Sequence, residues 1–175
     1  NGKLIENQDA IFVFTNPTET LMTTEKMNSG KAEFPFEQTL INRSENKIIQ
    51  VTQLKKDKSA TTVDSLSLAK QNFEFLSDTK TILGYKCQKA KTIINSNTIE
   101  LWYTNELQVK GAPTALGQNI GLVLEMVRNG NFVISATKIE KMKSVNPSLE
   151  LQKSTTKSPV IDGLTYKDLV WKSRF

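Results

Sequence analysis

Two tight-turn signals in the middle of the chain constrain the fold more strongly than any other sequence feature. Asn95-Ser96-Asn97 separates two runs rich in β-branched and aromatic residues, and Asn129-Gly130 separates two further strand-like runs. Asn and Gly tolerate the positive φ angles that tight hairpin turns require, so each signal predicts a pair of consecutive antiparallel strands. The segment 105–121 between them holds three glycines and a proline, and we expect it to form a long loop.

Alternation of apolar and polar residues extends the same pattern toward the N-terminus. It predicts strands over 32–42 and 47–56, and Pro35 within the first of these indicates an edge position or a bulge. The segment 65–76 is the single helix candidate, although Phe73-Glu74-Phe75 fits a strand equally well. With about eight to ten strands and at most one short helix, the sequence predicts a mainly β fold. We expect a single curved antiparallel sheet, shaped as a bowl or half-barrel.

The chain length of 175 residues suits one domain with a substantial core. Residues 1–143 are predicted to form the β-rich, bowl-like domain. In 144–175 Ser, Thr, Lys and Pro dominate, so this segment is predicted to be a linker toward a C-terminal domain. Because the chain opens at Asn1 and stops in the apolar and basic run 171–175, we expect both ends to be cut from a longer protein.

The absence of histidine limits the chemistry that this chain can perform. Without imidazole there is no histidine general base, no histidine-activated nucleophile and no histidine ligand for zinc. The one cysteine, Cys87, excludes intrachain disulfides and thiolate metal clusters. We predict that Cys87 is a small buried strand residue, with a reactive thiol beside Lys86 and Lys89 as the alternative. The chain is therefore expected to hold no catalytic residue, no metal and no cofactor.

The net charge of +5 raises the possibility of a nucleic-acid partner, which the charge distribution does not favour. The lysines are dispersed, and the densest cluster, Lys55-Lys56-Asp57-Lys58, is interrupted by an acid. Arg43 and Arg128 are the only arginines before the final residues, too few for phosphate or base-edge recognition. We expect no nucleic acid partner. No apolar run is long enough to span a bilayer, and no signal peptide is present, so no membrane span is expected.

Paired carboxylates can hydrolyse glycosides without histidine, so acids that lie close together near aromatic residues are candidate catalytic pairs. Glu74 with Asp78 and Glu100 with Glu106 are the acids that meet this description. Alternation along this strand places the side chain of Glu100 on the face opposite to that of Ile99, Leu101 and Tyr103. A solvent-facing role is therefore favoured over a catalytic one.

Trp102 and Tyr103 are the best candidates for ligand binding. If Tyr103 packs inward, Trp102 faces outward or into a concavity, where its ring offers a stacking surface for a sugar or an apolar ligand. Glu100 shares the strand face of Trp102, and Tyr85 follows the Gly84 turn. These four residues form the predicted binding set. Burial of Trp102 beneath the loop 105–121 is the alternative.

Several motifs in the central part of the chain resemble a known group of secreted proteins. They span about residues 72–140 and run in the order Gly84-Tyr85-Lys86-Cys87-Gln88-Lys89-Ala90, Glu100-Leu101-Trp102-Tyr103-Thr104, Gly111-Ala112-Pro113 and Gly121-Leu122-Val123-Leu124-Glu125. This pattern resembles the GLPGLI group of Bacteroidetes secreted proteins. The proline of the motif that names the group is missing here, since Gly117-Gln118-Asn119-Ile120-Gly121 stands in its place.

The segment 95–104, followed by 127–131, is more similar to one subgroup, the N-terminal domains that precede a peptide-N-glycosidase catalytic region. The resemblance implies a bowl-like β domain that accompanies an amidase removing N-glycans from glycoproteins. It also implies a non-catalytic accessory role in engaging glycoprotein or glycopeptide. The implied partners are that substrate and a C-terminal catalytic domain of the same chain, in a secreted or periplasmic protein.

Two other classes of function stay open on the sequence alone. The first is a free-standing periplasmic carrier that shields a lipid or another apolar ligand in the concave face of a half-barrel. The second is a protein-interaction platform that uses an exposed sheet edge near Pro35.

Overall fold

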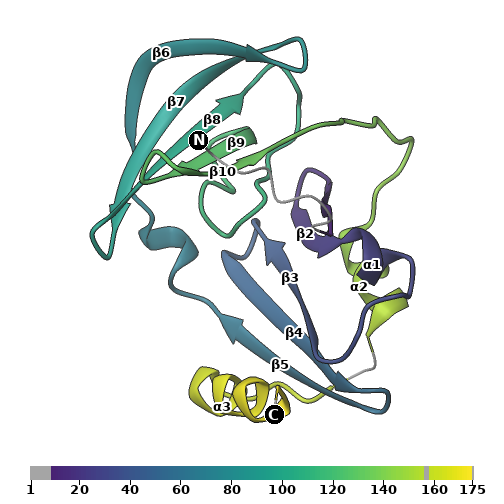
Figure 1. The fold of residues 1–175 in the computed structure, drawn as a ribbon. Coiled ribbons are helices and arrows are strands. Elements are labelled where there is room, and N and C mark those ends of the chain that lie inside the picture. The colour runs from purple at the N-terminus through teal and green to yellow at the C-terminus, as the bar shows by residue number, and fades with distance from the viewer. Residues whose placement is uncertain (1–8, 156–157, 175) are drawn as a thin grey trace.

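A computed structural model describes residues 9–155 and 158–174 of the chain. Within these residues ten strands form two antiparallel sheets of five strands each, in the orders β1-β2-β3-β4-β5 and β10-β9-β8-β7-β6. We refer to them as the N-terminal sheet and the C-terminal sheet. Figure 1 shows the two sheets one above the other, with α3 against the lower end of the N-terminal sheet and α2 beside α1.

The strands of each sheet follow one another in sequence, so within a sheet every strand pairs with the strands next to it in the chain. The N-terminal sheet comprises β1 (Ile11–Thr15), β2 (Glu19–Thr24), β3 (Phe36–Asn42), β4 (Lys47–Lys55) and β5 (Lys58–Asp64). The C-terminal sheet comprises β6 (Glu74–Ile82), β7 (Tyr85–Ile94), β8 (Asn97–Thr104), β9 (Leu122–Arg128) and β10 (Phe132–Ser135). Within the sheets the connections are short, apart from the segment 25–35, which contains α1, and the loop 105–121.

Three short α-helices and one 3-10 turn accompany the sheets in the described residues. They are α1 (Glu25–Asn28), the 3-10 turn η1 (Leu68–Lys70), α2 (Pro147–Ser154) and α3 (Gly163–Ser173). Asn146 caps α2 by accepting the backbone N–H of Leu149 at 3.1 Å, and Asp162 caps α3 by accepting that of Thr165 at 2.9 Å. These caps satisfy N–H groups that the first helical turn leaves unpaired.

Both predicted hairpins are confirmed. Asn95 and Ser96 adopt φ angles of 48° and 65° between β7 and β8, and Asn129 and Gly130 adopt 51° and 72° between β9 and β10. Two consecutive residues with positive φ define the turn whose twist matches that of antiparallel strands.

The mainly β prediction is confirmed, but the strands form two sheets rather than the predicted single sheet. Asp64 is the physical cause of the break. Its Oδ1 accepts the backbone N–H groups of Leu66 and Ser67, each at 2.9 Å, and this turn ends β5. Leu68 in η1 is then buried against the N-terminal sheet, so the chain leaves that sheet before β6 begins.

Three further expectations differ from the structure. The helix candidate 65–76 contains η1 and the start of β6, which agrees with the alternative that Phe73-Glu74-Phe75 begins a strand. Pro35 does not mark a sheet edge, because it precedes β3, and β3 lies between β2 and β4. The limit of at most one short helix is exceeded as well, because α1, α2 and α3 are all present.

The N-terminal sheet is covered on both faces. On one face Leu151 of α2 packs against Leu21, Leu40 and Val51. The other face holds a cluster in which the loop 105–121 takes part; its buried members are Met22, Ile41, Ile48 and Leu68, with Ala115 against them. The sheets are thereby joined by apolar contacts as well as by the chain.

The segment 144–175, which the sequence predicts to be a linker, contains α2 and α3. Tyr166 of α3 packs with Leu54 and Ala60 at the end of the N-terminal sheet. The hydroxyl of Tyr166 donates to Oε2 of Glu37 at 2.6 Å and also bonds Thr52. The division of the chain into 1–143 and 144–175 stays a prediction.

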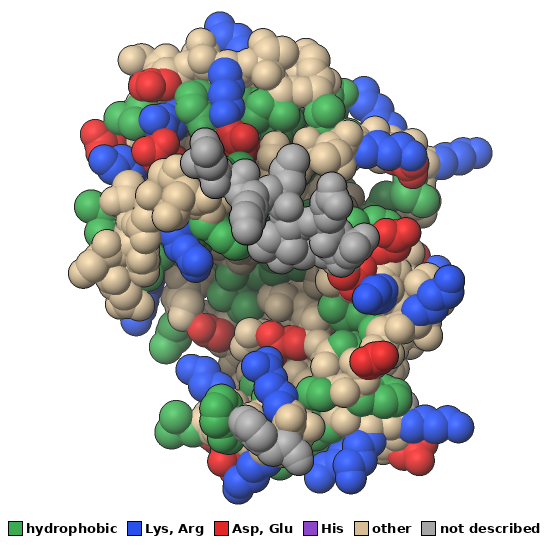
Figure 2. All heavy atoms as spheres, viewed as in Figure 1, with side chains coloured by type: hydrophobic (Ala, Val, Ile, Leu, Met, Phe, Trp, Pro, Cys, Tyr) green, Lys and Arg blue, Asp and Glu red, His purple; other side chains and the backbone are tan. Residues whose placement is uncertain are grey.

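The surface charge is dispersed, as the sequence indicates. Figure 2 shows Lys and Arg side chains scattered over one face of the molecule, with Asp and Glu between them. In the described part of the chain, no helix combines the length and the apolar character that crossing a bilayer requires.

Candidate functional site

The predicted binding residues Glu100 and Trp102 lie on one face of the C-terminal sheet. Lys89 pairs with Trp102, and Trp102 pairs with Glu125, so these side chains project from the same face. Lys80 joins them because it is paired with Cys87, two residues from Lys89. We call the face formed by Lys80, Lys89, Glu100, Trp102 and Glu125 the Trp102 face.

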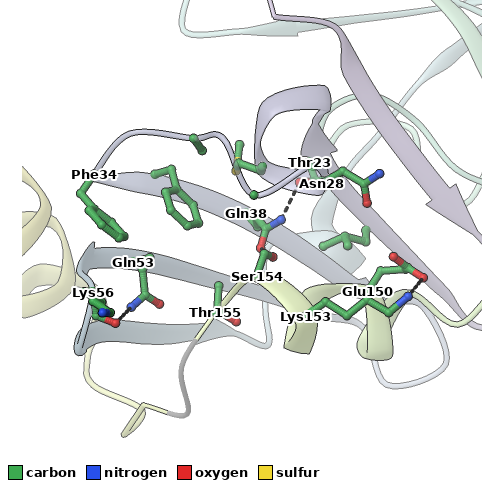
Figure 3. Close-up of a pocket in the computed structure, with 15 residues that line it drawn as sticks. Thr23, Asn28, Phe34, Gln38, Gln53, Lys56, Glu150, Lys153, Ser154 and Thr155 are labelled. Carbon is green, nitrogen blue, oxygen red and sulfur yellow. Dashed lines mark hydrogen bonds and ion pairs between the residues drawn. The ribbon is translucent and has the colours of Figure 1, made fainter.

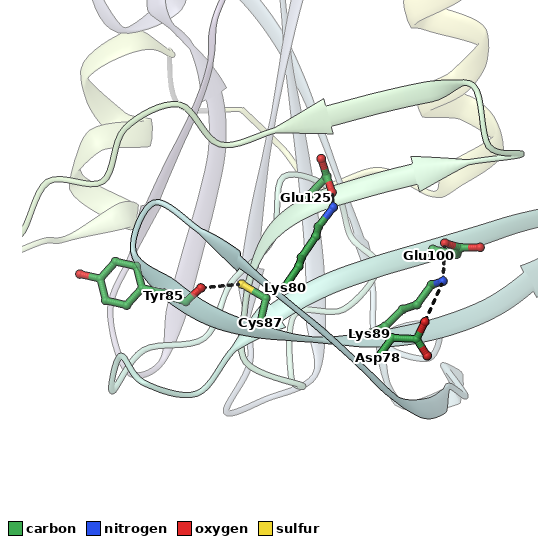
Figure 4. Close-up of polar contacts among 7 residues, drawn as sticks. All are labelled: Asp78, Lys80, Tyr85, Cys87, Lys89, Glu100 and Glu125. Carbon is green, nitrogen blue, oxygen red and sulfur yellow. Dashed lines mark hydrogen bonds and ion pairs between the residues drawn. The ribbon is translucent and has the colours of Figure 1, made fainter.

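Ion pairs connect the charged residues of the Trp102 face. Nζ of Lys89 lies 3.0 Å from Oε2 of Glu100 and 3.8 Å from Oδ2 of Asp78, and Lys80 is paired with Glu125 (Figure 4). Both ammonium groups also lie near the indole of Trp102, with Nζ of Lys80 at 4.4 Å and Nζ of Lys89 at 5.4 Å from the ring centroid. These cation–π contacts hold the indole in place within an array of alternating charges.

The four predicted binding residues are only partly brought together. Tyr103 points to the opposite face, where it is buried with Ala90 and Leu101, as expected if Trp102 projects outward. Tyr85 packs in the same cluster as Trp102, beside the buried Cys87. Glu100 and Tyr85 therefore share the side of the sheet of Trp102 but lie apart from each other, because Glu100 pairs with Lys91, six residues from Tyr85 along β7, and Tyr103 lies on the other side. A binding role for any of the four stays a prediction.

Trp102 is half-buried, between the two alternatives that the sequence left open. Its ring packs against Leu122 and Leu124, and Leu107 and Val109 of the loop 105–121 join this cluster. The loop thus covers part of the face from which Trp102 projects. The remaining exposed part of the ring lies among the lysines.

We expect Trp102→Ala to lower the free energy of unfolding by about 2–3 kcal/mol, less than the roughly 3–5 kcal/mol for a fully buried aromatic side chain. The loss combines apolar contacts with two cation–π interactions. Chemical denaturation of the variant and of Trp102→Phe, which keeps an aromatic ring, measures the difference. Wild-type stability for Trp102→Ala would show that the ring is not part of the core.

The carboxylates that the sequence grouped as pairs have different partners. Glu100 is paired with Lys89, whereas Oε1 of Glu106 accepts the backbone N–H of Lys86 at 3.3 Å. Asp78 interacts with Lys89 as well. Among the described residues, no three His, Cys, Asp or Glu side chains gather as a metal site would require.

Cys87 projects from the same side of the sheet as Trp102 and is fully buried there, which confirms the prediction of a buried strand residue. Burial raises the pKa of its thiol, and the backbone hydrogen bond from Ile82 and the ammonium of Lys80 offset this only in part. A thiol in such an environment is mostly protonated at neutral pH and reacts slowly.

We therefore expect a thiol reagent to modify Cys87 much more slowly in the folded protein than in denaturant. Absorbance with a chromogenic disulfide reagent, at neutral pH with and without guanidinium chloride, measures both rates. Equal rates would contradict the burial of the sulfur atom.

A second candidate site is a pocket on the N-terminal sheet, which we call the α2 pocket. It has a volume of about 350 Å³ and lies between the sheet, α1, α2 and the segment before β3. Its lining is Leu21, Thr23, Met27, Asn28, Gly30, Ala32, Phe34, Phe36, Gln38, Gln53, Lys56, Glu150, Lys153, Ser154 and Thr155. Figure 3 shows Phe34 and Lys56 toward one end and the Glu150–Lys153 pair toward the other.

The floor of the α2 pocket is polar and ordered by hydrogen bonds. Nε2 of Gln38 donates to Oγ1 of Thr23 at 2.5 Å, and Oγ of Ser154 donates to Oε1 of Gln38 at 2.8 Å. Nε2 of Gln53 donates to the carbonyl oxygen of Lys55 at 2.7 Å. The side walls are apolar, and the rings of Phe34 and Phe36 are stacked with their centroids 5.6 Å apart.

Sequence reasoning did not identify the α2 pocket. The shared parity of Ala32, Phe34 and Phe36 predicted one half-buried strand, but β3 begins only at Phe36, and all three residues line the pocket. The other walls come from α1 and α2. Alternation within a single segment cannot show that distant helices close a cavity over it.

The fold and these two sites define a mainly β domain of two antiparallel sheets, with a charged aromatic strand face and a separate open pocket. The chain belongs to the family described as "N-glycanase peptide, N-terminal domain", whose sequence profile matches residues 1–168. This confirms, at the level of the family, the resemblance to N-terminal domains that precede a peptide-N-glycosidase region. Membership of the GLPGLI group stays a prediction.

Solved structures agree with the family assignment. Two crystal structures of PNGF-II, in space groups C2 and P21, match the chain with TM-scores of 0.87 and 0.90. Both are 47% identical to it over 97% of its length, and the chain spans 31% of each PNGF-II chain. A search of curated proteins found no match.

Proposed function

We propose that this chain is the non-catalytic N-terminal accessory domain of a peptide-N-glycosidase, an amidase that removes N-linked glycans from glycoproteins. The observation that carries the proposal is the family match over residues 1–168. The similarity to PNGF-II supports it, because the chain corresponds to less than a third of that longer protein. A catalytic domain in the remaining part is the partner that the proposal requires.

The proposed role of the domain is to engage the glycoprotein. The Trp102 face suits this role because it combines an aromatic ring with charges of both signs, which match the mixed polarity of a protein surface. Glu100 keeps about a third of its side chain exposed, and Lys80 somewhat more, so both can contact a partner. Trp102, Glu100 and Tyr85 are the residues that we propose for this contact.

The carrier alternative is not favoured, because the family match associates the chain with N-glycanases. The interaction-platform alternative relied on an exposed edge near Pro35, and β3 is an inner strand. We also propose a secreted or periplasmic location, as the sequence resemblance implies. Fractionation of the source cells tests this: the proposal requires the protein in the periplasm or medium, and a wholly cytoplasmic protein contradicts it.

The absence of catalysis in this chain is tested by incubating it with a denatured glycoprotein and measuring released glycan by mass spectrometry. The proposal predicts no release by the 175-residue chain and release by the full-length protein. Robust release by the chain alone would overturn the non-catalytic assignment.

Glycoprotein binding is tested separately by biolayer interferometry with an immobilised glycoprotein. Glu100→Gln and Lys80→Gln, combined in one variant, should weaken binding and reduce its dependence on ionic strength, because surface charges act through screened interactions. Lys172→Gln combined with Asp168→Asn is the matched control, since this exposed ion pair lies on α3, beside the N-terminal sheet. Equal binding by both variants would exclude the Trp102 face as the contact surface.

A further inference from the structure

We propose that the α2 pocket binds a neutral acetamido sugar, of the kind found in N-linked glycans. The inference rests on the proposed function, since the glycoprotein would supply the sugar. It assigns to the domain a second contact on the N-terminal sheet, separate from the Trp102 face of the C-terminal sheet.

The size and the apolar walls of the pocket suit a sugar ring. Its volume of about 350 Å³ is at the lower end of the range of roughly 300–1,000 Å³ for small-molecule pockets. Phe34 and Phe36 are stacked at an interplanar angle of 19°, and Phe34 is 51% exposed. An exposed ring held by a neighbouring ring offers a flat surface for the C–H groups of a pyranose.

The side-chain amide of Gln38 has hydrogen-bonding capacity that the described residues do not use. Its side chain is only 2% exposed, yet among the described residues its amide makes two side-chain hydrogen bonds, one through nitrogen and one through oxygen. A primary amide has two donor hydrogens and two acceptor positions. One donor hydrogen and one acceptor position therefore remain on a residue that lines the pocket, the combination that pairs with an acetamido group or with vicinal hydroxyls.

The distribution of charge favours a neutral ligand. The interior polar side chains that line the pocket floor, Thr23, Gln38, Gln53 and Ser154, are all uncharged. At the rim, Glu150 and Lys153 neutralise each other through an ion pair of 2.9 Å, and the third charged lining residue, Lys56, is exposed to solvent at the other end (Figure 3). An ionic ligand would lose hydration without gaining a buried countercharge, whereas a neutral sugar has no such penalty.

The apolar residues beside the polar floor favour an acetamido sugar over a plain hexose. Leu21, Met27 and Ala32 line the same cavity as Gln38. An acetamido group offers an amide for Gln38 and a methyl group for the apolar wall, whereas a hydroxyl offers only the polar contact. We therefore expect the acetyl substituent to contribute to recognition.

Isothermal titration of the 175-residue chain with N,N′-diacetylchitobiose tests the proposal directly. Cellobiose, which carries hydroxyls in place of the acetamido groups, and an unglycosylated peptide are the comparison ligands. We expect saturable binding of the chitobiose and at least about tenfold weaker binding of cellobiose, as expected for the loss of a good hydrogen bond with its apolar contact. No saturable binding of chitobiose, or equal binding of cellobiose, would overturn the proposal, as would a peptide that displaces the sugar.

Variants locate the binding. Phe34→Ala should weaken chitobiose binding about tenfold, the usual effect of losing one aromatic anchor, and Ala32→Trp should abolish it by filling the cavity. Phe75→Ala is the matched control, because Phe75 is 59% exposed but lies on the C-terminal sheet. Thermal melting of each sample checks the fold. Unchanged binding in folded Phe34→Ala and Ala32→Trp would place the sugar elsewhere and contradict the inference.

The titration, combined with deletion of the domain from the full-length protein, separates the inference from the proposed function. If the chain binds no sugar but deleting the domain impairs deglycosylation of glycoprotein, the inference fails and the accessory role stands. If the pocket binds chitobiose but deleting the domain has no effect, the accessory role fails and the sugar site stands.

Discussion

Gly121→Ala is expected to destabilise the protein by about 3–5 kcal/mol, through backbone strain and overpacking together. Gly121 has a φ angle of 153°, and a Cβ atom there would lie 2.8 Å from the carbonyl oxygen of Thr104 and 2.9 Å from Cδ2 of Tyr103. The first of these atoms belongs to the backbone and cannot rotate away. The clash would force apart β8 and the end of the loop 105–121.

Gly130→Ala is the matched control for this prediction. Its φ angle of 72° is unfavourable for alanine, but a Cβ atom would have no neighbour within 4 Å. Gly130→Ala should therefore lower the free energy of unfolding by only about 1–2 kcal/mol, the effect of the backbone conformation alone. Urea denaturation of both variants measures the difference, and equal stability would contradict the close packing at Gly121.

Tyr166→Ala should also lower the free energy of unfolding by about 3–5 kcal/mol, as other large-to-small core substitutions do. Tyr166 is 3% exposed and fixes α3 to the N-terminal sheet. Tyr166→Phe keeps the ring but leaves Thr52 without its phenol partner, so it should cost only about 1–2 kcal/mol. Leu164→Ala, on the same helix at 82% exposure, should change stability by less than about 0.5 kcal/mol.

The burial of Tyr166 also predicts that the free energy of unfolding depends on pH. Burial and, secondarily, the hydrogen bond to Glu37 raise the pKa of Tyr166, so the folded state favours the neutral phenol. The resulting stability is fully present below the unfolded pKa of about 10 and is lost as the pH rises above it toward the folded value. Denaturation at pH 8 and pH 11 should show a smaller alkaline loss in Tyr166→Phe than in the wild type. Equal losses would contradict a buried phenol.

Features fixed by neighbouring residues could be predicted from the sequence. The turns at Asn95-Ser96 and Asn129-Gly130 depend on local φ preferences, and the loop 105–121 depends on its glycines and proline. The burial of Cys87 and the inward packing of Tyr103 follow from alternation along their strands. In each of these cases, the determining interaction lies within a few positions of the residue.

Features fixed by distant contacts could not be predicted in the same way. The division into two sheets depends on the turn at Asp64 and on the burial of Leu68 against β2, β3 and β4, which lie at least 13 residues earlier in the chain. The α2 pocket depends on α1 and α2 meeting over β3. The capping signals of α2 and α3, Asn146 before Pro147 and Asp162, are visible in the sequence, but both helices are short and lie in a polar segment.

The most direct test of the accessory role compares the full-length protein with a version that lacks residues 1–168, on two substrates. One substrate is an intact glycoprotein, and the other is a short glycopeptide that needs only the catalytic site. The account predicts that deletion lowers kcat/KM for the glycoprotein by at least about tenfold and for the glycopeptide by less than about twofold. Unchanged activity on the glycoprotein, or an equal fall on both substrates, would contradict a domain that engages the glycoprotein.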